Sequence, residues 1–420
     1  MASAEPEPGS RRDPAAAALL ARSATLLLAN GQTTEGARLA VERLSSVLHR
    51  PVVLRVRWGE ATLDASDGSA PVWMAVEPAG VDISRVVAAE AVVDAVCAGT
   101  LAPATALERL DAIKRAPPVA LARFAPMAAS GAAALAVIFG APDMLTVTLV
   151  AVVAGLGACL RRAAARFSGN PLLQPLVAAL LAGLAAGLVA RTSFPVAHRL
   201  LAVCPCMVLV PGPHFLNGMI DLVRARIPLG AARLALAGLI VLVICIGLLT
   251  GLALTGVSFP EAGVVRPVPL AIDVLAAGIA VAAYGSFFNM PWRMVGVPVM
   301  TGMVAHGLRW ELLQLGAGVP MGAFGATLVA GVTMTLVSHR LRLPFGAAAF
   351  ACVVSLIPGV YMFQAVSGLV TVARLGQKAG LDLVLGVATD LSTAGLTLLA
   401  MAAGLILPKL FADALLPQRQ

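Results

Sequence analysis

The chain has 420 residues, of which 59% are hydrophobic and only 12% are charged, with 30 basic and 22 acidic side chains. Soluble domains average about 45–50% apolar residues with glycine included and about 25% charged residues, so this composition excludes an ordinary soluble enzyme. The net charge of +8 does not indicate a nucleic-acid-binding protein, because the basic excess falls in short segments between apolar runs, where the positive-inside rule accounts for it.

The charged side chains are unevenly distributed along the chain. Residues 1–118 carry 26 of the 52 charged side chains with a net charge of −2, and the remaining 302 residues carry the other 26 with a net charge of +10. We therefore predict a polar N-terminal domain over residues 15–116, joined near Pro117 to an apolar membrane domain. Residues 1–14 are polar and contain prolines, so we expect them to form a disordered tail.

The N-terminal domain is predicted to be a small cytoplasmic α+β unit. The periodicity of its apolar residues predicts helices at 15–28, 34–48, 84–98 and 103–114 and strands at 52–56 and 72–76. About a hundred residues can bury a core of their own. The sequence offers no spacing typical of a nucleophile, a base and an orienting acid, so we do not expect an enzyme.

The apolar part, from Val119 to Lys409, has 291 residues. A helix that crosses a bilayer needs about 20 residues, so ten spans with short loops fit this length. We expect the spans near residues 119–141, 143–160, 171–190, 195–214, 229–256, 269–288, 292–308, 318–338, 344–362 and 381–407. With the N-terminus in the cytoplasm, fourteen basic residues flank the inner ends and six flank the outer ends, which predicts a multi-pass protein of the inner (plasma) membrane.

Two short stretches of the membrane domain resemble each other. Residues 206–212 (CMVLVPG) and residues 353–359 (VVSLIPG), 147 residues later, each follow a Gly/Ala-rich span that ends in arginine and proline. If each repeat holds five spans, an odd number, the second repeat crosses the membrane in the opposite sense to the first. We therefore predict two inverted five-helix repeats, at 117–258 and 259–410, followed by a C-terminal tail at 411–420. Inverted repeats are typical of alternating-access transporters, which bind substrate between the repeats near the midplane.

Both stretches end in Pro-Gly, which interrupts a helix because proline lacks a backbone donor and glycine permits non-helical angles. Unpaired backbone groups at membrane depth are tolerated where they line a cavity or face protein, so the breaks indicate a binding site, and a simple kink between packed helices is the alternative. The candidate substrate-binding residues at and beyond the breaks are Pro211, Gly212, His214, Asn217 and Asp221 in the first repeat and Pro358, Gly359, Tyr361 and Gln364 in the second. For Asp221, pairing with Arg224 or Arg226 at the inner surface is the alternative.

The segment Leu209–Leu222 (LVPGPHFLNGMIDL) resembles the signature of the threonine/serine exporter (ThrE) family. The N-terminal segments 27–31, 80–85 and 99–110 are similar as well, and the resemblance covers residues 18–408. It implies a cytosolic N-terminal domain, ten transmembrane helices and export of threonine and serine at the expense of the proton gradient. Some relatives, built from two separate subunits, are linked to dicarboxylate export instead. The second repeat departs from the pattern, because residues 360–364 (VYMFQ) replace its Asn-Gly.

Three acids within or near the spans are candidates for proton coupling. A charged acid at a helix centre costs about 2.5–3.5 kcal/mol on insertion scales, so each acid needs a partner or a function. Asp390 lies deepest, about nine residues into the last span, and is our first choice; a hydrogen bond to a neighbouring helix is the alternative. Asp273 and Asp382 lie near span ends, where they could snorkel or cap instead. We interpret His306, also near a span end, as an interfacial residue.

We expect no metal and no cofactor. Cys204-Pro205-Cys206 resembles the soft-metal motif of membrane pumps, but those pumps need a phosphorylatable Asp-Lys-Thr-Gly-Thr loop, which none of the three lysines provides. None of those lysines follows a glycine-rich phosphate-binding loop either. Transport must therefore draw on an ion gradient or on the substrate gradient.

The sequence thus predicts a mostly α-helical secondary transporter that exports threonine, serine or similar small polar metabolites across the lipid bilayer by proton antiport. A dicarboxylate (succinate-like) exporter is the first alternative, and a membrane-anchored hydrolase or sensor acting through the N-terminal domain is the second. The expected partners are the substrate, protons and lipid, with no nucleic acid. The oligomeric state stays open, with a homo-oligomer among the options.

Overall fold

The computed structural model describes residues 14–66, 70–76, 81–192, 194, 196–260, 267–341 and 345–415. The tail expected at residues 1–14 lies outside these residues except for Pro14, which begins the first helix. Of the tail expected at 411–420, residues 411–415 continue the last helix and the rest lies outside the described residues.

The N-terminal domain is an α+β unit with a three-stranded antiparallel sheet in the order β1-β2-β3. Its elements are α1 (Pro14–Ala29), α2 (Thr34–Val47), β1 (Val52–Arg57), β2 (Gly59–Ala65), β3 (Val72–Val76), α3 (Ile83–Cys97) and α4 (Pro103–Arg115). One face of the sheet packs on α1 and α2, where Leu27 and Leu44 are fully buried, and the other leaves Trp73 exposed. The predicted helices and two strands are present, and β2 is an additional strand that the sequence analysis missed.

The strand β2 is held by its two neighbours. Its sequence, GEATLDA, alternates small and polar residues and has few β-branched side chains, so its strand propensity is weak. It pairs with β1 from Arg57 opposite Glu60, across a tight turn at Gly59, whose φ of +84° suits glycine. Hydrogen bonds to both neighbouring strands compensate for the weak local preference.

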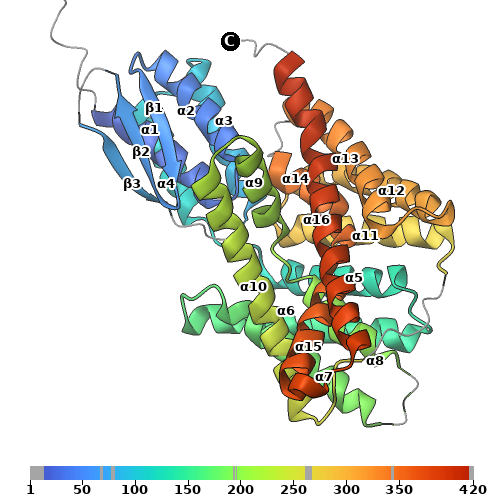
Figure 1. Ribbon diagram of the computed structural model, residues 1–420. Coiled ribbons are helices and arrows are strands. Elements are labelled where there is room, and N and C mark those ends of the chain that lie inside the picture. The colour runs from blue at the N-terminus through green and yellow to red at the C-terminus, as the bar shows by residue number, and fades with distance from the viewer. Residues whose placement is uncertain are drawn as a thin grey trace, which may run out of the picture.

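The remaining chain forms a bundle of long apolar helices (Figure 1). The helices are α5 (Leu121–Ile138), α6 (Met144–Phe167), α7 (Leu173–Ala190), α8 (His198–Met207), α9 (Gly212–Val223), α10 (Ile227–Leu254), α11 (Leu270–Phe287), α12 (Trp292–Gln314), α13 (Val319–Leu341), α14 (Phe345–Val353), α15 (Gly359–Leu375) and α16 (Leu381–Leu415). Two short 3₁₀ turns, Val354–Leu356 and Gly376–Lys378, precede and follow α15.

Among the described residues, seven helices are long and apolar enough to cross a membrane, and the number rises to nine if each of two bent helix pairs counts as one span. The chain is therefore a multi-pass membrane protein. The expected span that does not meet the same criterion is the one at 292–308, which corresponds to α12; this helix has 23 residues and carries Arg293, Arg309 and Glu311.

The two expected spans at 195–214 and 344–362 differ from the structure in one respect. The first is the pair α8 and α9, which meet at 53°, and the second is the pair α14 and α15, where the segments on either side of Pro358 meet at 59°. In both places the chain continues as a helix after Pro-Gly for at least three further turns, so the Pro-Gly break lies within the span and not at its end.

The helices of the two halves pack in the same pattern. α7 packs along α10 as α13 packs along α16, α6 lies between α5 and α7 as α12 lies between α11 and α13, and α5 meets α11. Small residues permit the closest of these contacts. A Cβ atom at Gly183 would lie 2.2 Å from the Leu248 carbonyl oxygen, and one at Gly404 would lie 2.1 Å from Thr327 Oγ1. Such glycines let membrane helices approach closely and gain packing energy without a hydrophobic driving force.

Candidate functional site

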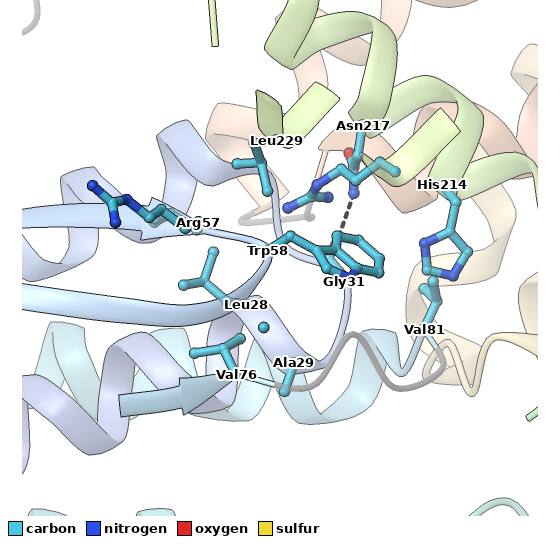
Figure 2. A pocket seen from close by; sticks show the side chains of 13 residues that line it. Leu28, Ala29, Gly31, Arg57, Trp58, Val76, Val81, His214, Asn217 and Leu229 are labelled. Atoms are coloured by element: carbon cyan, nitrogen blue, oxygen red, sulfur yellow. Dashed lines mark hydrogen bonds between the residues drawn. The ribbon is translucent and has the colours of Figure 1, made fainter. Parts of the chain in front are cut away.

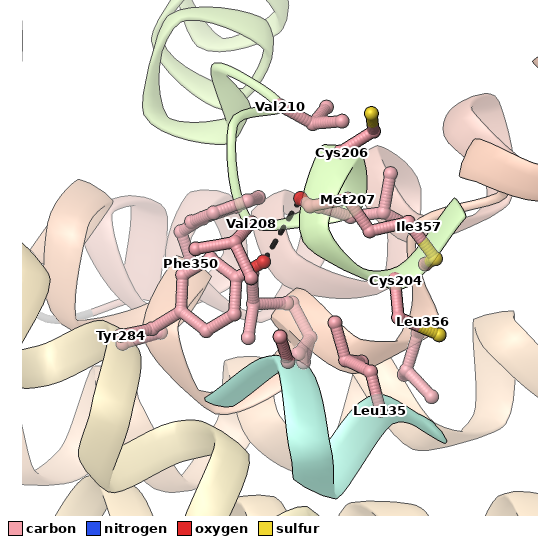
Figure 3. Packing of buried hydrophobic residues seen from close by; sticks show 14 of the residues in the cluster. Leu135, Cys204, Cys206, Met207, Val208, Val210, Tyr284, Phe350, Leu356 and Ile357 are labelled. Atoms are coloured by element: carbon pink, nitrogen blue, oxygen red, sulfur yellow. Dashed lines mark hydrogen bonds between the residues drawn. The ribbon is translucent and has the colours of Figure 1, made fainter. Parts of the chain in front are cut away.

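The two broken helix pairs meet in the middle of the bundle (Figure 3). α8 ends at Met207, whose carbonyl oxygen accepts a long hydrogen bond of 3.3 Å from the Val210 N–H. Tyr284 of α11 donates a shorter hydrogen bond of 2.9 Å to the same oxygen, and Tyr284 itself is fully buried. A side chain from the second half thus supplies a second donor to a backbone group at the first break.

The glycine of each Pro-Gly break lies against a side chain of the other broken helix pair. A Cβ atom at Gly212 would lie 1.4 Å from the ring of Phe350 on α14, and one at Gly359 would lie 3.0 Å from the side chain of Met207 on α8. Both positions therefore need a glycine or a displacement of the neighbouring side chain. The two breaks are therefore packed against each other at these residues.

A small cavity lies where α9 meets the N-terminal domain (Figure 2). Its volume is about 30 Å³, which is space for one or two waters. His214 and Asn217 line it from α9, Arg233 from α10, and Gly31 and Trp58 from the N-terminal domain. His214 and Asn217, both predicted for the site, therefore lie together. The N-terminal domain covers them, which the sequence did not predict.

Asn217 connects three parts of the chain. Its Nδ2 donates a hydrogen bond of 3.1 Å to the Gly31 carbonyl oxygen in the N-terminal domain. Its Oδ1 is buried and has no hydrogen-bond partner among the described residues. That oxygen points at the backbone of α14, since a Cβ atom at Gly346 would lie 2.6 Å from it. A buried acceptor without a donor is costly unless a ligand or water supplies one.

Asp221, one turn beyond Asn217, is paired with the chain's own donors. Thr34 Oγ1 donates to its Oδ2 at 3.1 Å, Arg233 Nε lies 3.2 Å from the same oxygen, and Arg226 Nη1 lies 3.4 Å from Oδ1. Of the alternatives for this residue, the ion pair with Arg226 is present, and Arg224 lies beside Glu35 instead.

Glu35 of α2 collects the remaining cations of this junction. Its carboxylate lies 2.5 Å from Arg38, 2.7 Å from Arg226 and 3.2 Å from Arg224. Burial alone would raise the pKa of Glu35, but hydrogen bonds from Arg38 and Arg226 outweigh it and lower that pKa to about 2. Glu35 is therefore charged at neutral pH and ties the N-terminal domain to the loop between α9 and α10.

The residues expected at the second break lie apart from this cavity. Pro358 and Gly359 form the break before α15, while Tyr361 and Gln364 follow on α15 and are half-buried. Neither of these polar side chains lines the cavity beside His214 and Asn217.

The three candidate acids have different surroundings. Asp382 is exposed and Asp390 is half-buried on α16, whereas Asp273 on α11 is only 4% exposed. His306 Nδ1 lies 2.6 Å from Asp273 Oδ2, and His306 is 1% exposed. His306 is therefore buried in the bundle and paired with an acid, which its interpretation as an interfacial residue did not include. Its partner lies 33 residues away on another helix, so no sequence pattern connects the two.

Comparison with known proteins covers most of the chain. A model of the threonine/serine exporter family ThrE matches residues 18–255. A second model, described as Threonine/Serine exporter, ThrE, matches residues 273–411. No solved structure matches the chain.

Proposed function

The chain belongs to the threonine/serine exporter family, and from that premise we propose that it exports threonine, serine or similar small hydroxy amino acids across the inner membrane by proton antiport. The observation that carries the proposal is the pair of broken helices, α8–α9 and α14–α15, at matched places in the two halves and packed against each other. Discontinuous helices that meet near mid-bundle are the usual binding elements of secondary transporters.

The helix packing supports two inverted repeats, α5–α10 and α11–α16. The main contacts between neighbouring helices in the first half have counterparts in the second, including the close pairs α7–α10 and α13–α16. If α12 is counted as a span as well, the total is ten, each repeat holds five spans, and the two repeats have opposite orientation. The charged residues of α12 then lie near its two ends, since Arg293 is at its N-terminus and Arg309 and Glu311 are near its C-terminus.

The substrate in this proposal contacts the start of α9 and of α15, at Pro211, Gly212, His214, Asn217 and Asp221 and at Pro358, Gly359, Tyr361 and Gln364. Asn217 Oδ1, a buried acceptor without a donor, suits an ammonium or a hydroxyl group of the substrate. Threonine and serine carry both donors, whereas an ionised dicarboxylate has none. This favours the amino acid over the dicarboxylate alternative.

Proton coupling is assigned to the acids of the second half. Among Asp273, Asp382 and Asp390, Asp273 is the buried one, and a buried acid within a membrane helix points to a functional role. Its neighbour His306 can accept or donate that proton across the 2.6 Å contact.

In this proposal the N-terminal domain controls the cytoplasmic ends of both halves, and its contacts with both support that role. Gly31 accepts from Asn217 in the first half, and Asp82 accepts from Asn289 Nδ2 in the second, at 3.1 and 3.0 Å from its two oxygens. The Ile83 N–H also donates to the Phe288 carbonyl oxygen at 2.9 Å. Alternating access requires the two halves to move relative to each other, so a domain docked on both holds the cytoplasmic side closed.

The proposal is tested with the full chain purified into liposomes and with inside-out membrane vesicles. We expect vesicles that are acidic inside to accumulate labelled threonine or serine, and liposomes loaded with threonine to exchange it without a pH gradient. Vesicles from cells without the protein are the control. Uptake of succinate alone would assign the chain to dicarboxylates, and no uptake of any of the three would reject the transporter proposal.

A further inference from the structure

Arg161 on α6 has no carboxylate and no hydrogen-bond acceptor among the described residues, and its Nε is buried. Its guanidinium stacks on aromatic rings instead, with Cζ 4.8 Å from the centre of the Phe287 ring and 5.6 Å from that of Phe124. The two rings are themselves stacked, 5.1 Å apart. Aromatic faces attract a cation but accept none of its five N–H groups in good geometry.

The two nearest arginines differ from Arg161 because each has a backbone acceptor. Arg162 Nη2 donates to the Val119 carbonyl oxygen, and Arg123 Nη2 donates to the Met290 carbonyl oxygen at 2.6 Å. None of the three forms an ion pair with a carboxylate in the described part of the chain. The group therefore concentrates positive charge without an ion-paired acid in the described part of the chain. The Nε groups of all three are buried without an acceptor there, and Arg161 is the member whose Nη groups also have none.

Arg161 also lies at the first helix break. It lines a narrow cavity together with Pro205 and Val208 of the α8–α9 pair and with Leu209 at the break itself. The rest of the lining comes mainly from small residues of α5, α6 and α7, among them Gly157 and Ala178. The cavity volume is about 10 Å³, space for about one water, so a larger group enters when the break moves away from α6.

We propose that Arg161 is the receptor for the carboxylate of the transported solute at the α8–α9 break. This inference rests on the proposed function and deepens it, because it assigns the carboxylate of the solute a partner on α6. Arg161 suits the role because a guanidinium binds a carboxylate through two parallel N–H···O bonds, and its aromatic neighbours hold it without occupying those donors. The same donors fit the phosphate of a lipid headgroup, and the experiment below separates the two sources.

The test compares R161Q and R161K with R162Q, the matched control, whose guanidinium also lies over Phe124 but already has a backbone acceptor. Threonine exchange in liposomes gives KM for each variant. Thermal unfolding in detergent is measured with threonine, with threonine methyl ester and with acetate, which gives a binding readout that does not depend on transport. Liposomes of neutral lipid, with and without phosphatidylglycerol, test the lipid source.

We expect R161Q to raise KM for threonine roughly 10- to 100-fold, R161K to raise it severalfold, and R162Q to leave it unchanged. The methyl ester should neither stabilise the wild type nor compete with threonine. If R161Q yields no folded protein, the KM of R161K decides, because lysine keeps the positive charge but cannot form the two parallel hydrogen bonds.

Three results would overturn the inference. The first is an unchanged KM in R161Q and R161K. The second is competition by the methyl ester as strong as that by threonine, and the third is that R161Q changes only the response to phosphatidylglycerol and not the KM for threonine. If threonine and acetate stabilise the wild type but not R161Q while no solute is exchanged, the carboxylate site stands and the exporter proposal fails. If exchange occurs with the same KM in all variants, the exporter proposal stands and the carboxylate site fails.

Discussion

His306 Nδ1 lies 2.6 Å from Asp273 Oδ2, so a buried imidazole–carboxylate pair connects α12 to α11. The second ring nitrogen of His306, Nε2, is buried and has no hydrogen-bond partner among the described residues. Arg309, one turn further along α12, lies within electrostatic range of both Asp273 and Tyr361 of α15. A proton added to this pair alters the balance among these four side chains.

Replacing either member of this pair should uncouple transport from protons. We expect Asp273→Asn and His306→Gln to abolish threonine accumulation driven by a pH gradient while threonine exchange continues at a measurable rate, because exchange needs no net proton movement. Asp382→Asn, at an exposed position of α16, is the control and should accumulate threonine normally. Gradient-driven accumulation by both variants at the wild-type level would remove the pair from the mechanism and leave Asp390 as the candidate.

Neutralising Glu35 should loosen the N-terminal domain. Glu35→Gln removes the carboxylate that Arg38, Arg224 and Arg226 share, while Arg226 keeps its contact with Asp221; loss of hydrogen bonds to a charged group costs about 1.5–3 kcal/mol. We expect faster proteolytic cleavage near Pro117 and a higher rate of threonine exchange. Glu42→Gln, whose partner Arg38 lies on the exposed side of the same helix, should change neither. Cleavage and exchange at wild-type rates in Glu35→Gln would exclude the domain as a gate.

The docking should not respond to pH in the neutral range. The pKa of Glu35 falls from its ordinary value of 4.5 to about 2 in the folded chain. The stability contributed by its charge is therefore complete above pH 4.5 and is lost only as pH falls towards about 2. Protection of the linker from protease, measured as a function of pH, should be flat at neutral pH and should decrease with added salt because part of the cluster is exposed.

The contact between Gly212 and Phe350 should be intolerant of a single methyl group. Gly212→Ala places a Cβ atom within 1.4 Å of the buried ring, so we expect a loss of about 1–3 kcal/mol of stability and strongly reduced exchange. Gly238→Ala on α10, where nothing lies within 4 Å, is the control. The double variant Gly212→Ala with Phe350→Ala should recover part of the lost exchange. Additive losses in the double variant would show that the two positions are not coupled.

Removing the Asn217 amide should weaken recognition of the substrate. We expect Asn217→Ala to raise the half-saturation concentration for threonine and serine about tenfold, because a hydrogen bond to a charged group is lost. Asn170→Ala, in the exposed loop between α6 and α7, should behave like the wild type. The same half-saturation concentration in both variants would contradict the assignment of Asn217.

Local patterns predicted the helices well because long apolar runs and caps are local properties. The N-terminal helices at 34–48 and 84–98 match α2 and α3 within a residue or so, and Thr33 and Asp82 cap them through side-chain oxygens. β2 was missed because its stability depends on β1 and β3. The Pro-Gly breaks were found, but the continuation of α9 and α15 beyond them was not, since Pro-Gly is also a common helix end.

Composition and the spacing of apolar residues were sufficient for a membrane protein with a polar N-terminal domain, and the repeated Pro-Gly stretch was sufficient for two broken helices, because both depend on residues close together in the chain. Which helices lie side by side decides the remaining contacts, namely the partners of Asp221, the Asp273–His306 pair and the aromatic surroundings of Arg161. The paired residues are 33 positions apart for Asp273 and His306 and 187 apart for Thr34 and Asp221. Such contacts arise from packing of whole helices and leave no periodic signal in the sequence.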